Sequence, residues 1–399
     1  MTTGRVLAAV CCVTMPIVCA QAQTPLIPKT REVSGLASEK QPPVPRLEVV
    51  HKFRTQMPIG IAITSTGRMF CSYPRWEDTN AYTLAELKNG REVPYPRGGD
   101  YQIGHKVNKQ NNLVSLQGLL VDAQDRLWVL DTGTINQKPL TPFVPKIICY
   151  NTKTGQEEIK FRFPADVVPP GSYLNDLRVD LKRGEAGTVY ITDSGKTPGL
   201  IVFDIKSQTA RRRLTNHPTM KAENKFVAFV EHQPLYMRPK TGVVKPLGFN
   251  ADSIAISPDG SRLYYAATAS HQLYSVSCAA LADTNQTDEQ VAKTINDLGE
   301  KGVSDGMLED TKGNVYTTNY EHNAIYRRNT SGTMELVVYS PNLLWPDTLS
   351  MQGGYLYVIS DQLHRQGGYN NGKDKRERPF ILFRVKTNAQ PVLLGKGAK

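Results

Sequence analysis

Five polar side chains recur at one position of a repeated sequence pattern, two residues ahead of a short apolar strand. The position is held by Gln117, Asn175, Asp252, Asp305 and Asp347, and in one further copy by Ile59. Carboxylates that are brought together raise one another's pKa or require a positive charge between them. If the copies converge on one axis, the position predicts either a metal cage or a site for a cationic ligand.

Oxygen atoms are the only metal ligands that this position offers, because neither His nor Cys occurs in it. Oxygen donors favour a hard ion such as Ca²⁺ over zinc, and Asn175, Asp252 and Asp305 are the candidate calcium ligands. The structural alternative is that short polar side chains cap strand ends and accept bonds from backbone N–H groups. The sequence leaves the metal site, the small-ligand site and strand capping open.

Four aromatic residues, Trp76, Phe249, Tyr320 and Trp345, stand next to the polar position or shortly after a strand. Aromatic ring faces attract cations and line small-molecule pockets, so these rings either wall a pocket or pack between sheets. The predicted ligand-binding residues are Gln117, Asn175, Asp252, Asp305, Asp347 and Trp345.

The polar position belongs to a hairpin pattern that occurs six times. Each copy alternates apolar and polar residues, breaks at a Gly, Asp, Asn or Pro cluster, and resumes with a β-branched and aromatic strand, which is the signal of a two-stranded hairpin. In "SPDG", for example, Pro presets the turn while Asp and Gly tolerate its tighter positions. The copies span residues 59–74, 117–133, 175–195, 252–268, 305–321 and 347–362.

Further strand candidates between the copies bring each unit to four strands. Repeated four-stranded units bury their faces by packing radially around an axis, so the sequence predicts an all-β, six-bladed β-propeller with four-stranded blades. We expect the N-terminal "RLEVVHKF" to pair with the C-terminal "FILFRVK" and close the ring. A β-sandwich or two β domains are the alternatives. The best helical candidate, residues 277–299, is expected between blades.

The N-terminus differs from the rest of the chain. Arg5, an apolar run and Ala20-Gln21-Ala22 predict a cleaved signal peptide over residues 1–22. Residues 23–45 contain five Pro and are expected to form an extended tail, and residues 46–399 form the propeller. The apolar run is too short to span a bilayer. We therefore expect a secreted or periplasmic protein with no stable membrane insertion.

The cysteine residues and the net charge narrow the possible disulfides and partners of the protein. Cys71, Cys149 and Cys278 lie in apolar strand-like runs, and buried thiols are the simplest interpretation, with one disulfide as the alternative. The net charge of +11 is spread along the chain, so no nucleic-acid partner is expected. No serine-nucleophile or zinc-hydrolase motif occurs.

Several blocks resemble those of the major royal jelly protein and Yellow family. They are "YPRW", "LWVLDTG", "YLNDLRVD", "VYITDSG" with "GLIVFD", "SDGMLEDTKGNVYTTNYEHNAIYR" and "LLWPDTLS", in that family's order. The resemblance implies a secreted six-bladed propeller. Family members act in nutrition and pigmentation; some resemble dopachrome-converting enzymes, and some bind small aromatic amines in the central cavity.

A more distant resemblance connects the repeats to calcium-dependent lactonase and senescence-marker propellers. Their metal is held by one Glu with Asn and Asp residues, whereas Ile59 stands at the first-blade position here; Asp176, Asn319 or Glu321 would have to substitute. We expect a propeller that binds a small aromatic or cationic molecule at the channel mouth. The alternative is an enzyme, either a metal-dependent lactonase-like hydrolase using Ca²⁺ or a tautomerase acting on catechols.

Overall fold

The computed structural model describes residue 1 and residues 46–76, 78, 80–96, 112–139 and 144–395. The chain divides into two units, Met1–Pro43 and Val44–Lys399. Apart from Met1, the predicted signal peptide and extended tail lie outside the described residues. Among the described residues no helix is long and apolar enough to cross a membrane.

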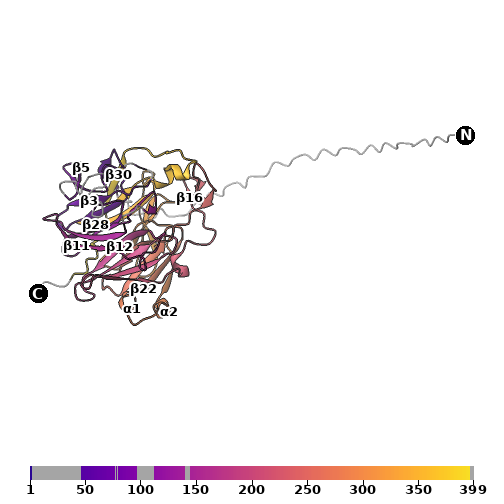
Figure 1. The fold of residues 1–399 in the computed structure, drawn as a ribbon. Coiled ribbons are helices and arrows are strands. Elements are labelled where there is room, and N and C mark those ends of the chain that lie inside the picture. The colour runs from indigo at the N-terminus through magenta and orange to yellow at the C-terminus, as the bar shows by residue number, and fades with distance from the viewer. Residues whose placement is uncertain (2–45, 77, 79, 97–111, 140–143, 396–399) are drawn as a thin grey trace, which may run out of the picture. The chain divides into compact units, whose positions relative to one another are not determined.

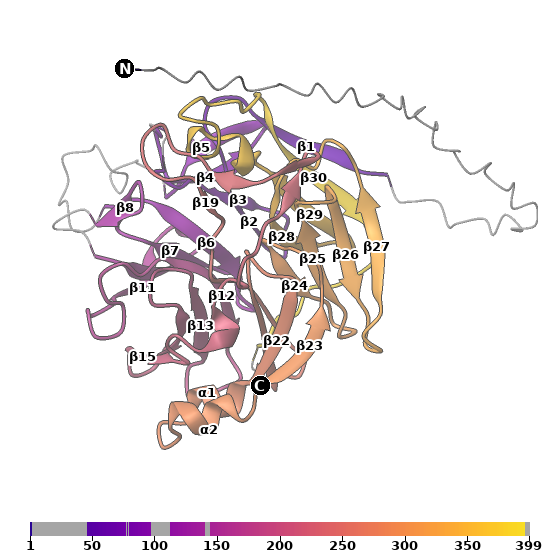
Figure 2. The same ribbon diagram turned by 90° about the vertical axis from the view of Figure 1, so that its right-hand side faces the viewer.

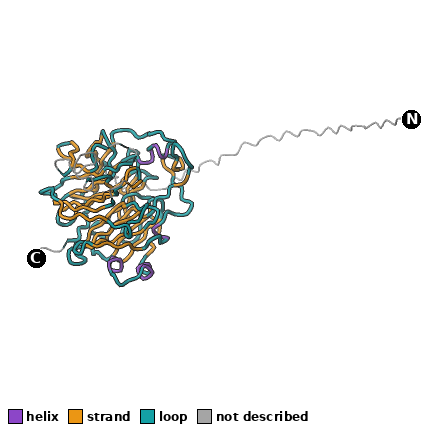
Figure 3. The backbone as a smooth tube through the Cα atoms, viewed as in Figure 1, coloured by secondary structure: helices purple, strands orange, loops and turns teal. Residues whose placement is uncertain are grey.

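Six four-stranded antiparallel sheets make up the second unit, and each is a propeller blade (Figures 1 and 2). From the axis outward the blades are β2 (Gly60–Ile63), β3 (Met69–Ser72), β4 (Leu84–Lys88), β5 (Arg91–Pro94); β6 (Leu116–Val121), β7 (Arg126–Asp131), β10 (Lys146–Asn151), β11 (Glu157–Arg162); β12 (Leu174–Asp180), β13 (Thr188–Asp193), β14 (Gly199–Asp204), β15 (Thr209–Arg213); β20 (Ala251–Ile256), β21 (Arg262–Ala267), β22 (Gln272–Ser277), β23 (Asn296–Glu300); β24 (Met307–Glu309), β25 (Val315–Asn319), β26 (Ala324–Arg328), β27 (Met334–Tyr339); and β28 (Pro346–Gln352), β29 (Tyr355–Ser360), β30 (Phe380–Lys386), β1 (Glu48–Phe53). The predicted six-bladed all-β propeller is confirmed, and the tube drawing shows many strands and few helices (Figure 3).

The last blade closes the ring as predicted, because its outermost strand comes from the N-terminal side of the propeller. β1 pairs antiparallel with β30, with Glu48 opposite Arg384 and Phe53 opposite Phe380. The Glu48 carboxylate also accepts a bond from the Arg384 guanidinium at 2.8 Å.

A recurring Asp at the end of the second strand fixes the chain just ahead of the inner strand. The Asp131 carboxylate accepts bonds from the Val114 and Ser115 N–H groups and pairs with buried Lys146 at 2.7 Å. Asp193 likewise accepts from the Tyr173 N–H. These bonds hold in place the residues that lead into the polar position.

The helical insertion lies at a different place from the one that the sequence predicted. The helices α1 (Cys278–Ala282) and α2 (Asp288–Ala292) lie inside one blade, between β22 and β23, and not between blades as expected. Cys71, Cys149 and Cys278 are free and buried, as the simplest interpretation predicted. The small sheets are β8 (Thr134–Ile135) with β9 (Lys138–Pro139), β16 (Phe229–Val230) with β17 (Gln233–Pro234), and β18 (Tyr236–Met237) with β19 (Lys245–Pro246).

Two long loops pack together on the propeller, and we call them the roof: residues 221–249 and residues 361–379. The roof includes β16 to β19 and the short 3₁₀ turns η3 (Leu363–Arg365) and η4 (Gly367–Tyr369); another such turn, η2 (Pro218–Met220), precedes it. The Arg238 N–H donates to the Gly368 carbonyl at 2.8 Å, and Glu231 pairs with Arg365. Apolar roof residues share one core cluster with Ile59, Tyr320 and Trp345.

Candidate functional site

The polar position lies at one end of the ring of inner strands, which we call the upper mouth. Gln117, Asn175, Asp252 and Asp347 are the second residues of β6, β12, β20 and β28. Asp305 stands two residues before β24, and Ile59 directly precedes β2. Consecutive inner strands contact one another around the ring, so these residues surround the axis at a common level.

Five carboxyl groups interact at the upper mouth. The members of this carboxyl cluster are Asp176, Asp252, Asp305, Asp347 and Asp361. Asp305 and Asp347 each keep 9% of their surface exposed, and Asp361 is fully buried. Burial is therefore the main reason why every carboxyl in the cluster has a raised pKa.

Two pairs of carboxyl groups interact electrostatically within the cluster. Asp252 interacts with Asp305, and Asp347 interacts with Asp361. Burial first and the neighbouring charges second raise the pKa of Asp252 and of Asp347. Burial raises the pKa of Asp361 to about 8, while its interaction with Asp347 acts in the opposite direction. Burial also raises the pKa of Asp305, to about 6. Because each negative charge disfavours the ionised form of its neighbour, the cluster retains protons at a higher pH than isolated carboxyl groups do.

Asp361 is the member that the sequence-based prediction missed. Asp361 directly follows β29, and Asp131 and Asp193 are the last residues of the equivalent strands β7 and β13. The alignment of the repeats therefore indicated an Asp at this position. Asp131 pairs with Lys146 and Asp193 with Arg212. Asp361 accepts a bond from the Leu363 N–H and otherwise faces Asp347.

Basic groups compensate the cluster only in part. Arg178 lies 3.2 Å from the Asp176 carboxylate and opposes the rise of its pKa. Lys301 is buried, and burial lowers its pKa to about 7, although Asp305 acts in the opposite direction. Its Nζ donates to the Ser270 and Gly302 carbonyls. Near neutral pH the upper mouth therefore contains more acidic groups than basic groups that could neutralise them.

An aromatic stack supports the acidic side of the mouth. The Trp345 indole N–H donates to Asp305 Oδ2 at 2.6 Å, and the Trp345 ring stacks on Tyr320 with centroids 4.1 Å apart. The Tyr320 hydroxyl donates to the Thr268 carbonyl, and the Thr268 hydroxyl donates to Asp252. Trp345 has φ of +53°, a left-handed conformation that is strained for a bulky residue.

The opposite side of the mouth is neutral. The Trp76 indole N–H donates to the Tyr173 hydroxyl at 2.6 Å, and that hydroxyl donates to Gln117 Oε1 at 3.0 Å. Asn175 donates to the Ser194 hydroxyl. The mouth thus combines carboxyl groups on one side with a chain of neutral hydrogen bonds on the other.

The remaining residues proposed from the sequence have other contacts. Glu321 pairs with His271 at 3.7 Å, and the Asn319 side-chain carbonyl accepts from the His322 N–H. Phe249 packs at the edge of the core cluster that contains Trp345. Of the three candidate substitutes for the missing Glu, only Asp176 joins the carboxyl cluster.

The candidate calcium ligands are Asn175, Asp252 and Asp305. Within the ranges that the structure describes, no group of three or more His, Cys, Asp and Glu side chains is placed to hold a metal ion. The Asn175 side-chain amide donates to the Ser194 hydroxyl, and Ile59 supplies no donor from the first blade.

The sequence model of the family described as Major royal jelly protein matches residues 114–393. Protein yellow from Drosophila erecta and that from Drosophila melanogaster are each 25% identical over 254 residues, which cover 58% of this chain and 43% of the relative. The chain therefore matches less than half the length of these curated relatives.

Solved structures give a likeness of fold. Regucalcin from Agrobacterium tumefaciens, described as a calcium-binding protein, has a TM-score of 0.52 at 14% identity and covers 87% of this chain and 98% of its own. A gluconolactonase from Xanthomonas campestris has a TM-score of 0.50 at 12% identity, with coverages of 87% and 97%. At these identities the likeness shows a common propeller fold alone.

Proposed function

The chain belongs to the major royal jelly protein family, and we propose that it binds a small aromatic or cationic molecule at the upper mouth of its channel. The observation that carries the proposal is the carboxyl cluster. Several carboxyl groups held together away from water destabilise their own ionised forms. A positive charge placed among them stabilises those forms, which provides the affinity for a cation.

The aromatic residues support a ligand that also carries a ring. Trp76 and Tyr173 are partly exposed on the neutral side of the mouth. Trp345 and Tyr320 are fully buried on the acidic side and support Asp305 there. Ring faces attract cations and pack against other rings. A protonated amine attached to an aromatic ring would therefore match both sides. The expected export of the protein is a separate proposal that rests on the pattern of residues 1–22.

Calorimetric titration with 2-phenylethylamine and with 2-phenylethanol tests the proposal, because the two molecules differ mainly in charge. We expect saturable binding of the amine with an affinity at least about tenfold above that of the alcohol, equivalent to about 1.4 kcal/mol. Equal affinities, or no saturable heat with the amine, would contradict the proposal.

A second candidate is catalysis at the same mouth. The pKa of Asp305, raised to about 6, suits a group that exchanges protons near neutral pH, as a tautomerase acting on catechols requires. A calcium-dependent hydrolase is the other enzymatic possibility, with Asn175, Asp252 and Asp305 as ligands; Ca²⁺ would polarise a substrate carbonyl there. Because no group of three or more His, Cys, Asp and Glu side chains in the described ranges is placed to hold a metal ion, the geometry supports this possibility less than amine binding.

Calcium titration separates the metal-dependent possibility from the others. A calcium site predicts that added CaCl₂ raises the melting temperature of the wild type, and that Asp305→Ala abolishes the rise. A melting temperature that does not respond to calcium would exclude the metal-dependent hydrolase and leave amine binding untouched.

A further inference from the structure

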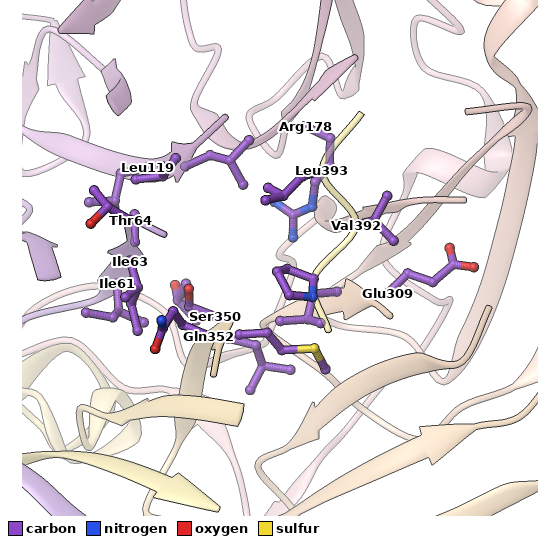
Figure 4. Close-up of a pocket in the computed structure, with 18 of the residues that line it drawn as sticks. Ile61, Ile63, Thr64, Leu119, Arg178, Glu309, Ser350, Gln352, Val392 and Leu393 are labelled. Atoms are coloured by element: carbon purple, nitrogen blue, oxygen red, sulfur yellow. The ribbon is translucent and has the colours of Figure 1, made fainter. Parts of the chain in front are cut away.

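A cavity lies at the end of the inner strands opposite the upper mouth, and we call it the lower cavity. Its volume is about 100 Å³. Figure 4 shows Ile61, Ile63 and Leu119 on one side of it and Val392 and Leu393 on another. Ile256, Leu308, Leu349 and Met351 complete the apolar lining. The polar position of the upper mouth contributes no side chain to this lining.

The C-terminal segment builds one wall of the lower cavity. This strap, residues 387–395, leaves β30 and crosses from one blade to another. On one side Asp310 bridges to Pro391 and the Thr311 N–H donates to the Gln390 carbonyl at 3.0 Å. On the other, Asp180 bridges to Leu394 and the Leu181 N–H donates to the Leu394 carbonyl at 2.8 Å. The residues between these anchors line the cavity.

The side chain of Leu393 distinguishes this wall from ordinary core packing. Leu394 is buried with 2% exposure, whereas Leu393 remains 47% exposed beside the cavity. Exposed leucine at the edge of an apolar cavity leaves surface that a bound apolar molecule would cover. The strap thus supplies a backbone held by hydrogen bonds and an exposed apolar side chain that a ligand would contact.

The cavity is lined by four charged groups, and each is paired, hydrogen-bonded or neutral: Asp125, Asp176, Arg178 and Glu309. Arg178 donates to Asp176, to the Leu177 carbonyl and to the Met307 carbonyl. Asp125 accepts bonds from the Ser65 N–H and hydroxyl groups. Burial raises the pKa of Glu309 to about 8, so this side chain is mostly neutral at pH 7. The cavity therefore offers little attraction to a charged ligand.

We propose that the lower cavity is a second binding site, for a compact, uncharged and mostly apolar molecule of about six to eight non-hydrogen atoms, with the strap as one wall. Apolar cavities of about 150 Å³ accommodate a benzene ring, and the lower cavity approaches that size. The Ser350 hydroxyl and the Gln352 amide at the rim (Figure 4) suit a ligand with one neutral polar group such as a hydroxyl.

Titration of the full chain with 1-hexanol, hexylamine and hexanoate tests this site by calorimetry. We expect saturable binding of 1-hexanol, and binding of the amine and of the acid that is at least about tenfold weaker. Absence of saturable 1-hexanol binding, or equal affinity for either charged molecule, would overturn the proposal.

A bulky side chain on the strap locates the site. Leu393→Trp should fill the cavity and weaken 1-hexanol binding about tenfold or more. Leu336→Trp is the matched control, because Leu336 is 48% exposed on β27 and does not line the cavity. Both variants should keep the wild-type melting temperature and the binding of 2-phenylethylamine. Wild-type affinity for 1-hexanol in Leu393→Trp would place the ligand elsewhere and overturn the assignment.

Discussion

The two ends of the channel are built by the same six inner strands and yet provide opposite environments. β28 begins with Pro346 and Asp347 at the carboxyl-rich mouth and ends with Met351 and Gln352 at the apolar cavity. A strand of this length spans the channel, so the chemistry of each end depends on which residues of each strand face it. A single ring of strands can therefore support a charged site and an apolar site independently.

Arg178 stands at the division between the two ends. Its guanidinium lines the lower cavity and binds Asp176, which belongs to the carboxyl cluster. It also reaches the Met307 carbonyl, on the other side of β20 in the ring. Acidic side chains predominate above Arg178, whereas the charged side chains below it are paired, hydrogen-bonded or neutral. Substitutions at the two ends should therefore have different effects.

The largest effect is expected when one carboxylate of the upper mouth loses its charge. Asp305→Asn keeps an acceptor for the Trp345 indole but removes a negative charge next to Asp252. Affinity for 2-phenylethylamine should fall about tenfold to a hundredfold, since hydrogen bonds to charged groups contribute about 1.5–3 kcal/mol. Calorimetry measures the change. Asp204→Asn, at the end of β14, is the control and should bind as the wild type does.

A smaller effect is expected on stability, and it depends on pH. A carboxyl whose pKa is raised on folding binds its proton more tightly in the folded chain, so the unfolding free energy falls as pH rises from about 4 towards the raised pKa. Burial and its neighbours raise the pKa of Asp347. Asp347→Asn should therefore stabilise the protein at pH 8 and do so much less at pH 4.

Denaturant unfolding at both pH values measures this difference. Equal stabilisation at pH 4 and pH 8 would show that packing, and not charge, is responsible. The same variant should bind 2-phenylethylamine more weakly, so that stability and binding change in opposite directions at pH 8.

The smallest effect is expected from Trp345→Phe. The indole N–H bond lowers the pKa of Asp305, in opposition to burial, and Phe cannot donate it. The pKa of Asp305 should rise above about 6, and the pH at which amine binding reaches half its maximum should move upward with it. Affinity at pH 8 should fall only about threefold, or about 0.6 kcal/mol. An unchanged pH midpoint would show that Trp345 does not affect the ionisation of Asp305.

The fold and the polar position at the upper mouth could be predicted from the sequence. The six hairpins follow from periodicity and turn residues, and the polar position follows from their alignment, because equivalent strand positions converge on the axis. Trp345 was found as a neighbour of that position. Asp361 was missed although its equivalents Asp131 and Asp193 were visible; the sequence did not show that it would meet Asp347 in place of a basic residue.

The roof, the strap and the lower cavity could not be predicted in the same way. Residues 221–249 and 387–395 lack the repeat, so no alignment places them against a blade. Their positions depend on contacts between distant segments, such as Asp180 with Leu394. The lower ends of these inner strands are mostly apolar, and only the path of the strap shows that space remains beside Leu393.

Proton release on binding tests the central claim most directly, namely that the carboxyl cluster binds a cation. Calorimetric titration of 2-phenylethylamine in two buffers of different ionisation enthalpy at pH 7 measures the number of protons exchanged. Because a cation favours the ionised carboxyls whose pKa is raised, we expect net release of protons, and less release with Asp347→Asn. Binding with no proton release, or with uptake, would contradict the account.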